Sequence, residues 1–239
     1  MQISVILISY NRAFFVNQAL ESIAQQTAID DIHCIVVDDG SNTETVDTIL
    51  SYKDKFPQFD LVQIHPKKEE DRRTTNRVAI AVNSGLKHII NNNILTQYVS
   101  YLADDDLFFK DRCEKMVNYL DKYDDVFFLY HYMKIYRCNN KGILSDLVFN
   151  LDDTWDEATK YWVSNIDNRI DHCTFMHRYT DDLWPENDIY RRCSDYGFIL
   201  QCLNKNKKFA HIPEHLGVGR KIFGDSINLE NKIGDRTNK

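Results

Sequence analysis

Apolar and amphipathic stretches alternate along the first half of the chain. Short apolar runs rich in β-branched residues predict buried strands, and stretches with apolar side chains every three or four positions predict helices. On this basis we expect strands at 3–9, 32–37, 61–65 and 98–102, and helices at 15–26, 44–52, 76–90 and 111–123. Strands that alternate with helices predict an α/β protein with a mainly parallel sheet covered on both faces. The ligand crevice of such a sheet lies at the carboxyl ends of its strands.

The second half of the chain is β-rich at first and then aromatic and polar. Residues 126–137 and 143–149 predict two strands, and the polar, glycine-containing connection between them is typical of a hairpin. We therefore expect a smaller antiparallel extension beside the parallel sheet. A further helix is expected over 195–203. Residues 224–239 are polar with little apolar periodicity, which indicates a C-terminal tail.

The composition fits one domain with a substantial core, because the 239 residues are 43% hydrophobic. The net charge of −7, from 29 basic and 36 acidic residues, argues against a general nucleic-acid-binding role. No apolar run approaches the roughly 20 residues of a membrane span. The N-terminus lacks the basic lead and cleavage site of a signal peptide, so we expect a cytoplasmic protein. The six cysteines form no Cys-x-x-Cys pair, which favours free thiols over zinc or disulfides.

Three consecutive aspartates, Asp104, Asp105 and Asp106, lie between the expected strand at 98–102 and the expected helix at 111–123. Adjacent carboxylates at the end of a strand repel one another, so a divalent cation or an ordered set of donors has to neutralise them. This placement indicates a metal site that also holds an anionic ligand. The alternative is a solvated acidic turn that caps the next helix.

Four motifs of the first half resemble those of the family 2 glycosyltransferases and occur in the same order. They are Val5–Arg12, Ala19–Thr27, Val36–Ser41 and the aspartate triplet. Within that family, the chain is most similar to the spore-coat polysaccharide glycosyltransferase. This narrower likeness depends on Ile170–Tyr179 and on Tyr190-Arg191 followed by Ser194-Asp195.

The resemblance implies a GT-A fold and an enzyme that moves a sugar from a nucleotide-sugar donor to a hydroxyl acceptor, with inversion at the anomeric carbon. It also implies a divalent metal, Mg²⁺ or Mn²⁺, bridging the donor diphosphate, and carboxylate oxygens suit either ion. A single domain over 1–223 then has a nucleotide-sugar-binding half (1–110) and an acceptor-binding half (111–223), followed by the tail. The acceptor stays open: a glycan, a small molecule, a protein or a modified nucleic acid.

The resemblance also assigns roles to individual side chains. By position within the motif, Asp105 is expected to bind the metal and Asp104 the ribose hydroxyls. Asp106 is expected to contact metal-bound water or to support the loop. Many family members have a further aspartate at the position of Ala103. The assignment of Asp104 to the ribose hydroxyls is therefore the one that departs from the common family pattern. The full set of predicted donor-binding residues is Ser9, Tyr10, Arg12, Asp39, Arg77, Asp104 and Asp105.

The same resemblance places Tyr10 against the nucleotide base and Asp39 as a hydrogen-bond acceptor from it. The N3–H group of uracil or thymine suits a carboxylate acceptor, which favours UDP or dTDP over a purine nucleotide. Arg77 corresponds to a family arginine near the base or the diphosphate. Arg72 and Arg73 compete with it for that role.

Inversion by a single displacement needs a general base that removes the proton of the acceptor hydroxyl. Asp195, at the expected start of a helix, matches the downstream acidic motif of the family and is the predicted base. Asp188 is the second choice and Asp171 a weaker one. An aspartate at the first turn of a helix also stabilises that helix, and this role is compatible with catalysis.

Two other classes of protein stay open. A nucleotidyltransferase also uses carboxylate-bound Mg²⁺, but it normally has a glycine-rich basic loop where this chain has Ser9-Tyr10-Asn11-Arg12. A non-catalytic nucleotide-sugar- or glycan-binding module would keep Asp39 and Asp105 and lack the base.

Several residues of the second half have two interpretations each. His172 is expected to serve packing and hydrogen bonding, whereas His177 and Arg178 serve packing or contact the donor sugar or diphosphate. Gly217–Lys221 is expected to form a loop that closes over the diphosphate or lies at the surface. The aromatic side chains of this half either stack on acceptor sugars or belong to the core: Trp155, Tyr161, Trp162, Tyr179 and Trp184.

Overall fold

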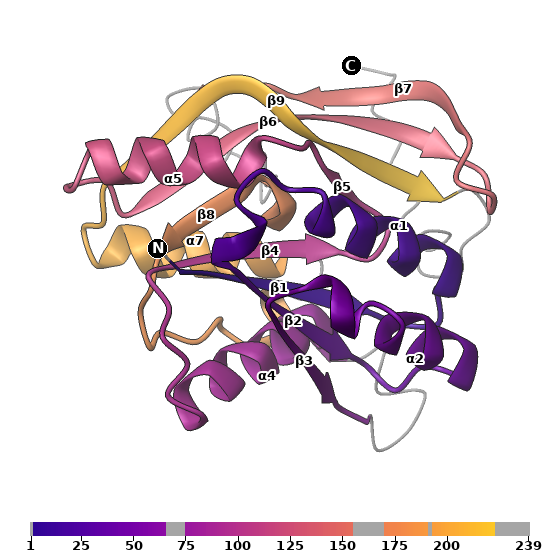
Figure 1. Ribbon diagram of the computed structural model, residues 1–239. Helices are drawn as coiled ribbons and strands as arrows, with labels where there is room; N and C mark the ends of the chain where they lie inside the picture. The colour runs from indigo at the N-terminus through magenta and orange to yellow at the C-terminus, as the bar shows by residue number, and fades with distance from the viewer. Residues whose placement is uncertain (1, 66–74, 155–169, 191–192, 223–239) are drawn as a thin grey trace.

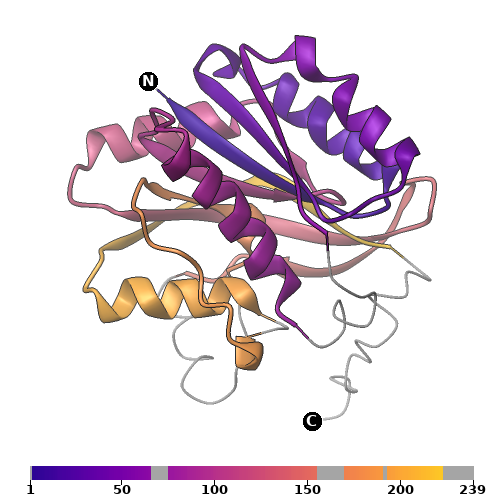
Figure 2. The same cartoon turned by 90° about the horizontal axis from the view of Figure 1, so that it is seen from below.

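One mixed sheet runs through the part of the chain that this computed structural model describes, which is residues 2–65, 75–154, 170–190 and 193–222 (Figure 1). Within those residues the strand order is β3-β2-β1-β4-β8-β6-β9-β5, and β7 pairs with β6 beside this path. Helices cover both faces of the sheet, as Figures 1 and 2 show together. The expected α/β architecture is confirmed.

The first half supplies four parallel strands: β1 (Ile3–Ser9), β2 (Ile32–Asp38), β3 (Gln58–Gln63) and β4 (Tyr98–Ala103). β1 pairs with both β2 and β4, in a register that sets Ser9 opposite Asp38 and Ile8 opposite Ala103. β3 pairs with β2 in the same direction. The carboxyl ends of all four strands therefore lie along one edge of the sheet.

Five α-helices of the described residues pack on the sheet: α1 (Ala13–Ala24), α2 (Thr43–Leu50), α4 (Arg77–Asn91), α5 (Arg112–Lys122) and α7 (Ser194–Asn204). Val5 and Leu7 of β1 belong to a hydrophobic cluster with α1 and α5, whereas Ile6 belongs to a second cluster with α4 and α7. Adjacent side chains of β1 thus point to opposite faces, and both faces are buried. All five helices lie within two residues of their expected bounds.

Gly85 allows α4 to lie very close to β1. A Cβ atom at this position would lie only 2.8 Å from Cγ2 of Ile6 and 3.2 Å from Cγ2 of Val37. Figure 2 shows α4 crossing the face of the sheet that is nearest the viewer. This close approach fixes the start of α4, and with it Arg77, at the carboxyl ends of the strands.

The rest of the described chain adds five strands: β5 (Leu107–Phe108), β6 (Phe128–Cys138), β7 (Leu144–Leu151), β8 (Phe175–Arg178) and β9 (Phe209–Ile222). β6 and β7 form the expected antiparallel hairpin. β8 runs antiparallel to both β4 and β6 and joins the two halves of the sheet. Four short 3-10 helices complete the description: η1 (Ile29–Asp31), η2 (Lys53–Lys55), η3 (His172–Thr174) and η4 (Asp188–Tyr190).

The segment Gly217–Lys221 belongs to β9, so the loop expected there is wrong. β9 lies parallel to β6, where Gly219 and Arg220 face Ile135 and Tyr136, and it runs antiparallel to β5. A Cβ at Gly217 would lie 2.9 Å from the carbonyl oxygen of Leu107, so glycine here permits strand pairing rather than loop motion. Arg220 is only 4% exposed.

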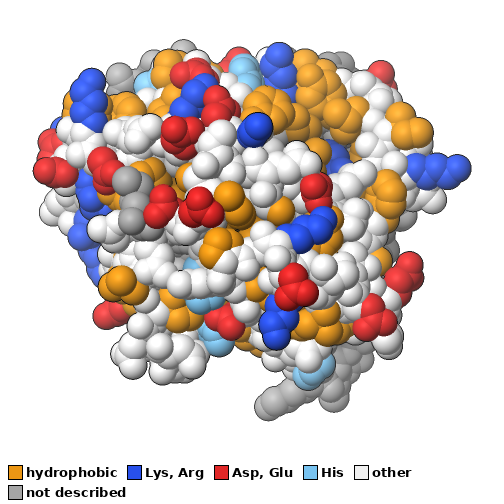
Figure 3. All heavy atoms as spheres, viewed as in Figure 1, with side chains coloured by type: hydrophobic (Ala, Val, Ile, Leu, Met, Phe, Trp, Pro, Cys, Tyr) orange, Lys and Arg blue, Asp and Glu red, His pale blue; other side chains and the backbone are white. Residues whose placement is uncertain are grey.

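On the face of the described residues that Figure 3 shows, acidic and basic side chains are interspersed, and no continuous basic stripe is visible. Among the described helices, none has both the length and the hydrophobicity needed to cross a membrane. All six cysteines are free, as expected, and five of them are buried.

Candidate functional site

The carboxyl ends of β1, β2 and β4 bring three polar loops together. In this register, the residues directly after Ser9, Asp38 and Ala103 emerge side by side. The backbone N–H of Asp39 donates to the carbonyl of Ser9 at 2.9 Å, and that of Asp104 donates to the carbonyl of Ile8 at 3.1 Å. The structure therefore assembles most of the predicted donor-binding residues at one edge of the sheet.

Asp104 ties the end of β4 to the end of β1. Its Oδ2 atom accepts from the hydroxyl of Ser9 at 3.1 Å and from the backbone N–H of Tyr10 at 3.0 Å. Its Oδ1 atom accepts from Nη1 of Arg12 at 2.8 Å. With these three donors and 4% exposure, Asp104 holds the strand ends together.

Asp105 lies beside the same guanidinium. Nη1 of Arg12 is 2.9 Å from Oδ2 of Asp105, so one nitrogen bridges two neighbouring carboxylates. Burial raises the pKa of Asp105, the Arg12 charge opposes that rise, and the Asp104 charge adds to it. Arg12 thus supplies part of the positive charge that the triplet requires.

Asp106 is held from the opposite side by β9. Its Oδ1 atom accepts from the backbone N–H of Arg220 at 2.8 Å. The Arg220 guanidinium donates to the backbone carbonyl of Asp105 and to Oε1 of Gln18, and it lies 5.0 Å from the ring centroid of Phe15. Burial and the Asp105 charge raise the pKa of Asp106. Arg220 is therefore a support for the aspartate loop that sequence reasoning missed.

Asp39 forms an ion pair with Arg77, the first residue of α4. Nε of Arg77 is 3.1 Å from Oδ2 of Asp39, and Nη2 donates to Oδ1. The neighbouring Asp38 is fully buried and accepts from the backbone N–H of Ser41 at 3.1 Å, so it stabilises the turn rather than facing the site. Arg72 and Arg73, the alternatives to Arg77, lie outside the described residues.

Asp195 lies in the first turn of α7 and is 8% exposed. Its Oδ1 atom accepts from the backbone N–H of Tyr196 at 2.9 Å, and its Oδ2 atom accepts from the backbone N–H of His172 at 3.2 Å. Nδ1 of His172 is 3.3 Å from Oδ1 of Asp171 and 3.9 Å from Oδ2 of Asp195. Although burial opposes it, the charges of Asp171, Asp195 and Asp106 raise the pKa of His172 to about 9.

The η3 turn connects Asp195 to the triplet. Asp171 caps this turn by accepting from the backbone N–H of Cys173 at 2.9 Å, and Sγ of Cys173 accepts from the backbone N–H of Ala103 at 3.2 Å. Asp171, His172 and Cys173 are also close enough together to act as metal ligands. The side chain of Asp188, the second choice for the base, lies outside the described set.

His177 and Arg178 serve packing. Nε2 of His177 accepts from the hydroxyl of Tyr101 at 2.8 Å, and Nδ1 donates to the carbonyl of Arg178 at 2.7 Å. The guanidinium of Arg178 donates to the carbonyls of Val126 and Leu120, at 2.9 and 2.6 Å. These hydrogen bonds all join β8 to neighbouring parts of the protein, so both side chains stabilise the position of β8.

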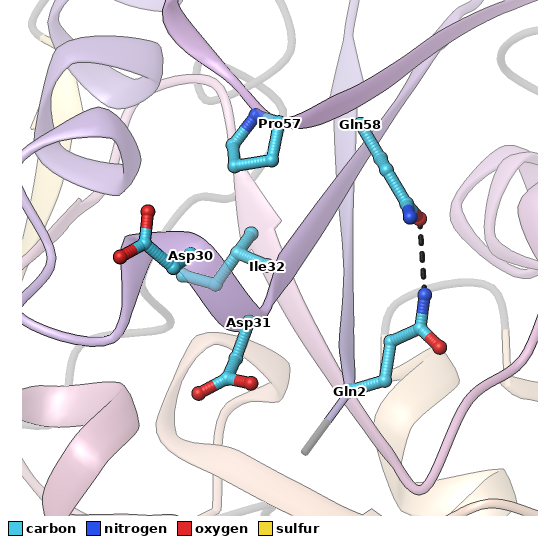
Figure 4. A pocket seen from close by; sticks show the side chains of 6 residues that line it. All are labelled: Gln2, Asp30, Asp31, Ile32, Pro57 and Gln58. Carbon is cyan, nitrogen blue, oxygen red and sulfur yellow. Dashed lines mark hydrogen bonds between the residues drawn. The ribbon is translucent and has the colours of Figure 1, made fainter.

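A separate pocket lies at the opposite edge of the sheet, around the amino ends of β1, β2 and β3 (Figure 4). Nε2 of Gln2 donates to Oε1 of Gln58 across it at 3.0 Å. Its lining residues are Gln2, Asp30, Asp31, Ile32, Pro57 and Gln58, none of which belongs to the predicted site. The pocket is thus separate from the candidate functional site, which is the acidic edge described above.

Two sequence relatives illustrate the likeness to known proteins. Protein CgeD of Bacillus subtilis (strain 168) is 31% identical over 179 residues, which are 74% of this chain and 38% of CgeD. An uncharacterized glycosyltransferase of Rickettsia felis is 32% identical over 125 residues, which are 52% of this chain and 18% of that protein. The chain thus spans well under half the length of either relative.

Solved structures of S. aureus TarS have a similar fold. The crystal structure of TarS aligns over 92% of this chain and 37% of TarS, with a TM-score of 0.62 and 16% identity. A complex of TarS residues 1–349 with UDP aligns over 92% of this chain and 61% of that chain, with a TM-score of 0.61 and 16% identity. The shared architecture is the GT-A fold, as the resemblance implied.

The sequence also matches a family description over most of its length. Residues 4–184 match Glycosyl transferase family 2, and this range includes the aspartate triplet and Asp39. The strand ends that assemble the acidic site thus lie within the matched range. The chain belongs to glycosyl transferase family 2 and is a glycosyltransferase by family.

Proposed function

We propose that this chain transfers a sugar from a UDP- or dTDP-sugar to a hydroxyl acceptor, with inversion at the anomeric carbon and with help from a divalent metal. The observation that carries this proposal is that Asp39, which follows β2, and Asp104 and Asp105, which follow β4, lie on either side of the carboxyl end of β1 at one edge of the sheet. TarS, which has the same fold, has been crystallised with UDP and with UDP-GlcNAc. Those ligands suggest the class of donor to test.

Asp39 and Arg77 form the nucleotide end of the proposed site. The Asp39 carboxylate accepts the N3–H of uracil or thymine, and the bidentate contact with Arg77 fixes its orientation. Tyr10 follows β1 on the same edge and packs against the base. Because adenine lacks a ring N–H donor of this kind, this end of the site disfavours an adenine nucleotide, and UDP or dTDP is the proposed donor nucleotide.

The carboxylates of the triplet fit a divalent metal. Burial and mutual repulsion raise the pKa of Asp105 and Asp106, so these groups lack full charge compensation, and their hard oxygens suit Mn²⁺ or Mg²⁺. Asp105, still partly exposed, would hold the metal, and Asp106 would act through water or by supporting the loop. The bound metal would stabilise the negative charge that develops on the departing nucleoside diphosphate.

Asp195 is the proposed general base. Its carboxylate takes the proton of the acceptor hydroxyl while that oxygen bonds to the anomeric carbon from the face opposite the leaving diphosphate. The bond between the anomeric carbon and the phosphate oxygen breaks in the same step, which inverts the configuration. The backbone N–H groups of His172 and Tyr196 orient the carboxylate for this role.

Of the aromatic side chains that could stack on an acceptor sugar, the structure describes Trp184 and Tyr179. Trp184 is 2% exposed and stacks on Phe198, with ring centroids 5.4 Å apart, so it belongs to the core. Tyr179 is half-buried and its hydroxyl donates to Asp181 at 2.6 Å. Trp155, Tyr161 and Trp162 lie outside the described residues. The division into halves at residue 110 and the cytoplasmic location stay predictions.

An assay of donor turnover tests the proposed function. The full chain is incubated with a panel of UDP- and dTDP-sugars and Mn²⁺, and the phosphate products are identified. Release of UDP or dTDP is the expected result. Release of pyrophosphate would instead indicate a nucleotidyltransferase, and donor binding without any turnover would indicate a binding module.

A further inference from the structure

Arg12 occupies the position where the proposed metal is needed. Its Nη1 atom lies 2.8 Å from Oδ1 of Asp104 and 2.9 Å from Oδ2 of Asp105. The three side chains are only 16%, 6% and 15% exposed, so water screens these contacts weakly. The two carboxylates therefore already share a cation that belongs to the protein.

The backbone of Arg12 is anchored, which leaves its side chain as the part that can change partners. Asn11 has a left-handed φ of 51°, and its backbone N–H donates to Oγ of Ser41 at 2.9 Å. Oδ1 of Asn11 accepts from the backbone N–H of Asn42 at 2.7 Å. The carbonyl of Arg12 accepts from the N–H of Val16 at 2.9 Å, in the first turn of α1.

Arg220, the other guanidinium beside the triplet, is held differently. It is 4% exposed, and its contacts go to the backbone carbonyl of Asp105, to Gln18 and to the ring of Phe15. None of these contacts uses the carboxylate oxygens of Asp104 or Asp105. Of these two guanidinium groups, Arg12 is the one that blocks those oxygens.

We propose that Arg12 is an exchangeable counter-ion, which leaves Asp104 and Asp105 for the donor diphosphate when a divalent cation binds and so couples metal binding to nucleotide binding. This inference rests on the proposed function, because it takes Asp105 as the metal ligand. Without nucleotide, displacement of Arg12 would break its contacts with both carboxylates in a partly buried position, so the metal would bind weakly. With nucleotide, the diphosphate oxygens accept the planar guanidinium, so displacement costs less.

The coupling is measurable without knowing the sugar or the acceptor. Mn²⁺ binding to the full chain is titrated by electron paramagnetic resonance of the free ion, with and without UDP or dTDP. For the wild type, nucleotide should tighten Mn²⁺ binding on the order of tenfold or more. Arg12→Gln should bind Mn²⁺ on the order of tenfold tighter than the wild type when nucleotide is absent, and nucleotide should then tighten it less. A merely structural role for Arg12 predicts weaker binding, not tighter.

Two variants control for general effects on the edge. Lys87→Gln removes a positive charge from an exposed position on α4 outside the proposed site, so it should leave Mn²⁺ binding without nucleotide unchanged. Arg12→Lys keeps a charge that reaches one carboxylate at a time, so its affinity should fall between those of the wild type and Arg12→Gln. Circular dichroism verifies that each variant is folded.

The outcomes separate this inference from the proposed function. If nucleotide promotes Mn²⁺ binding to the wild type but Arg12→Gln and Arg12→Lys bind the free ion no tighter, Arg12 is not an exchangeable counter-ion and the metal site stands. If the wild type binds no Mn²⁺ with either nucleotide, both the metal site and the counter-ion are overturned. If Arg12→Gln and Lys87→Gln tighten Mn²⁺ binding equally, the effect is one of net charge and the inference also fails.

Discussion

Arg77 contacts both carboxylate oxygens of Asp39, which joins the first residue of α4 to the loop that follows β2. The pair is partly buried, and burial lowers the pKa of Arg77 without discharging it. Close packing at Gly85 holds α4 against β1 and β2, so the position of Arg77 follows from the core. The geometry of the proposed nucleotide end is thus set by helix-sheet packing.

Replacing Asp39 by asparagine should weaken UDP or dTDP binding. The amide has less negative charge and only one acceptor oxygen, and Arg77 loses its ion pair. A hydrogen bond to a charged group contributes about 1.5–3 kcal/mol, so we expect a rise in Kd of roughly 10- to 100-fold. Isothermal titration calorimetry measures it, and Asp47→Asn, an exposed change on α2, is the control that should leave Kd unchanged.

Asp195→Asn should abolish most turnover while donor binding stays intact. Loss of a general base lowers kcat by about 10²- to 10⁴-fold, and the nucleotide end is formed by other residues. The measurement is the rate of nucleoside diphosphate release alongside the Kd for UDP. A larger loss of kcat in Asp171→Asn than in Asp195→Asn would show that the base is misassigned.

Gly85→Ala should destabilise the protein, although alanine normally favours a helix interior by about 1 kcal/mol over glycine. The new methyl group would meet Cγ2 of Ile6 at 2.8 Å, and overpacking of this kind costs about 1–3 kcal/mol. Urea denaturation gives the change in the free energy of unfolding. In the double variant with Ile6→Ala, the loss should be smaller than the sum of the two single losses, and strict additivity would contradict the predicted contact.

His177 should make the protein sensitive to mild acid. Burial lowers the pKa of His177 to about 4, whereas the unfolded chain has the ordinary value near 6.5. The unfolded state therefore binds the proton more readily, so the contribution to stability is complete above about pH 6.5 and is lost as the pH falls toward 4. The difference amounts to up to about 3 kcal/mol.

The test of the His177 prediction compares pH profiles rather than single values. His177→Gln is expected to be less stable at pH 7, because the contacts with Tyr101 and the Arg178 carbonyl change. Its free energy of unfolding should nevertheless fall less between pH 7 and pH 5 than that of the wild type. Parallel profiles for the two proteins would contradict the assignment of a neutral, buried His177.

The first half of the fold was predictable because its signals are local. Apolar runs such as Ile3–Ser9 alternate with amphipathic helices, and this order determines a parallel sheet whose carboxyl ends share an edge. The placement of Asp39 and Asp104 at the same edge follows from that topology together with the family motifs. Local pattern was therefore sufficient to predict the parallel strands that form the acidic edge.

The remaining features depend on contacts between distant residues. β8 joins β4 to β6, although Phe175 lies more than 70 positions after Ser100. No local sequence pattern predicts a pairing between such distant residues. Arg220 reaches Asp105 and Asp106 from 114 to 115 positions later in the chain. The basic, glycine-containing sequence around Arg220 is equally typical of a loop and of a strand. Only the pairing of β9 with β6 and β5 shows that it is a strand. The contact of Arg12 with two carboxylates likewise could not be predicted from the sequence, because it depends on where the side chains lie.

The most direct test of the proposed metal site at the acidic edge is the melting temperature of the wild type and of Asp105→Asn with UDP or dTDP, in Mn²⁺ and in EDTA. At a nucleotide concentration about 100 times Kd, binding should raise the wild-type Tm by roughly 5–10 °C in Mn²⁺. The rise should be much smaller in EDTA, and Asp105→Asn should lose the metal-dependent part. An equal rise in EDTA and in Mn²⁺, unchanged in Asp105→Asn, would contradict the account.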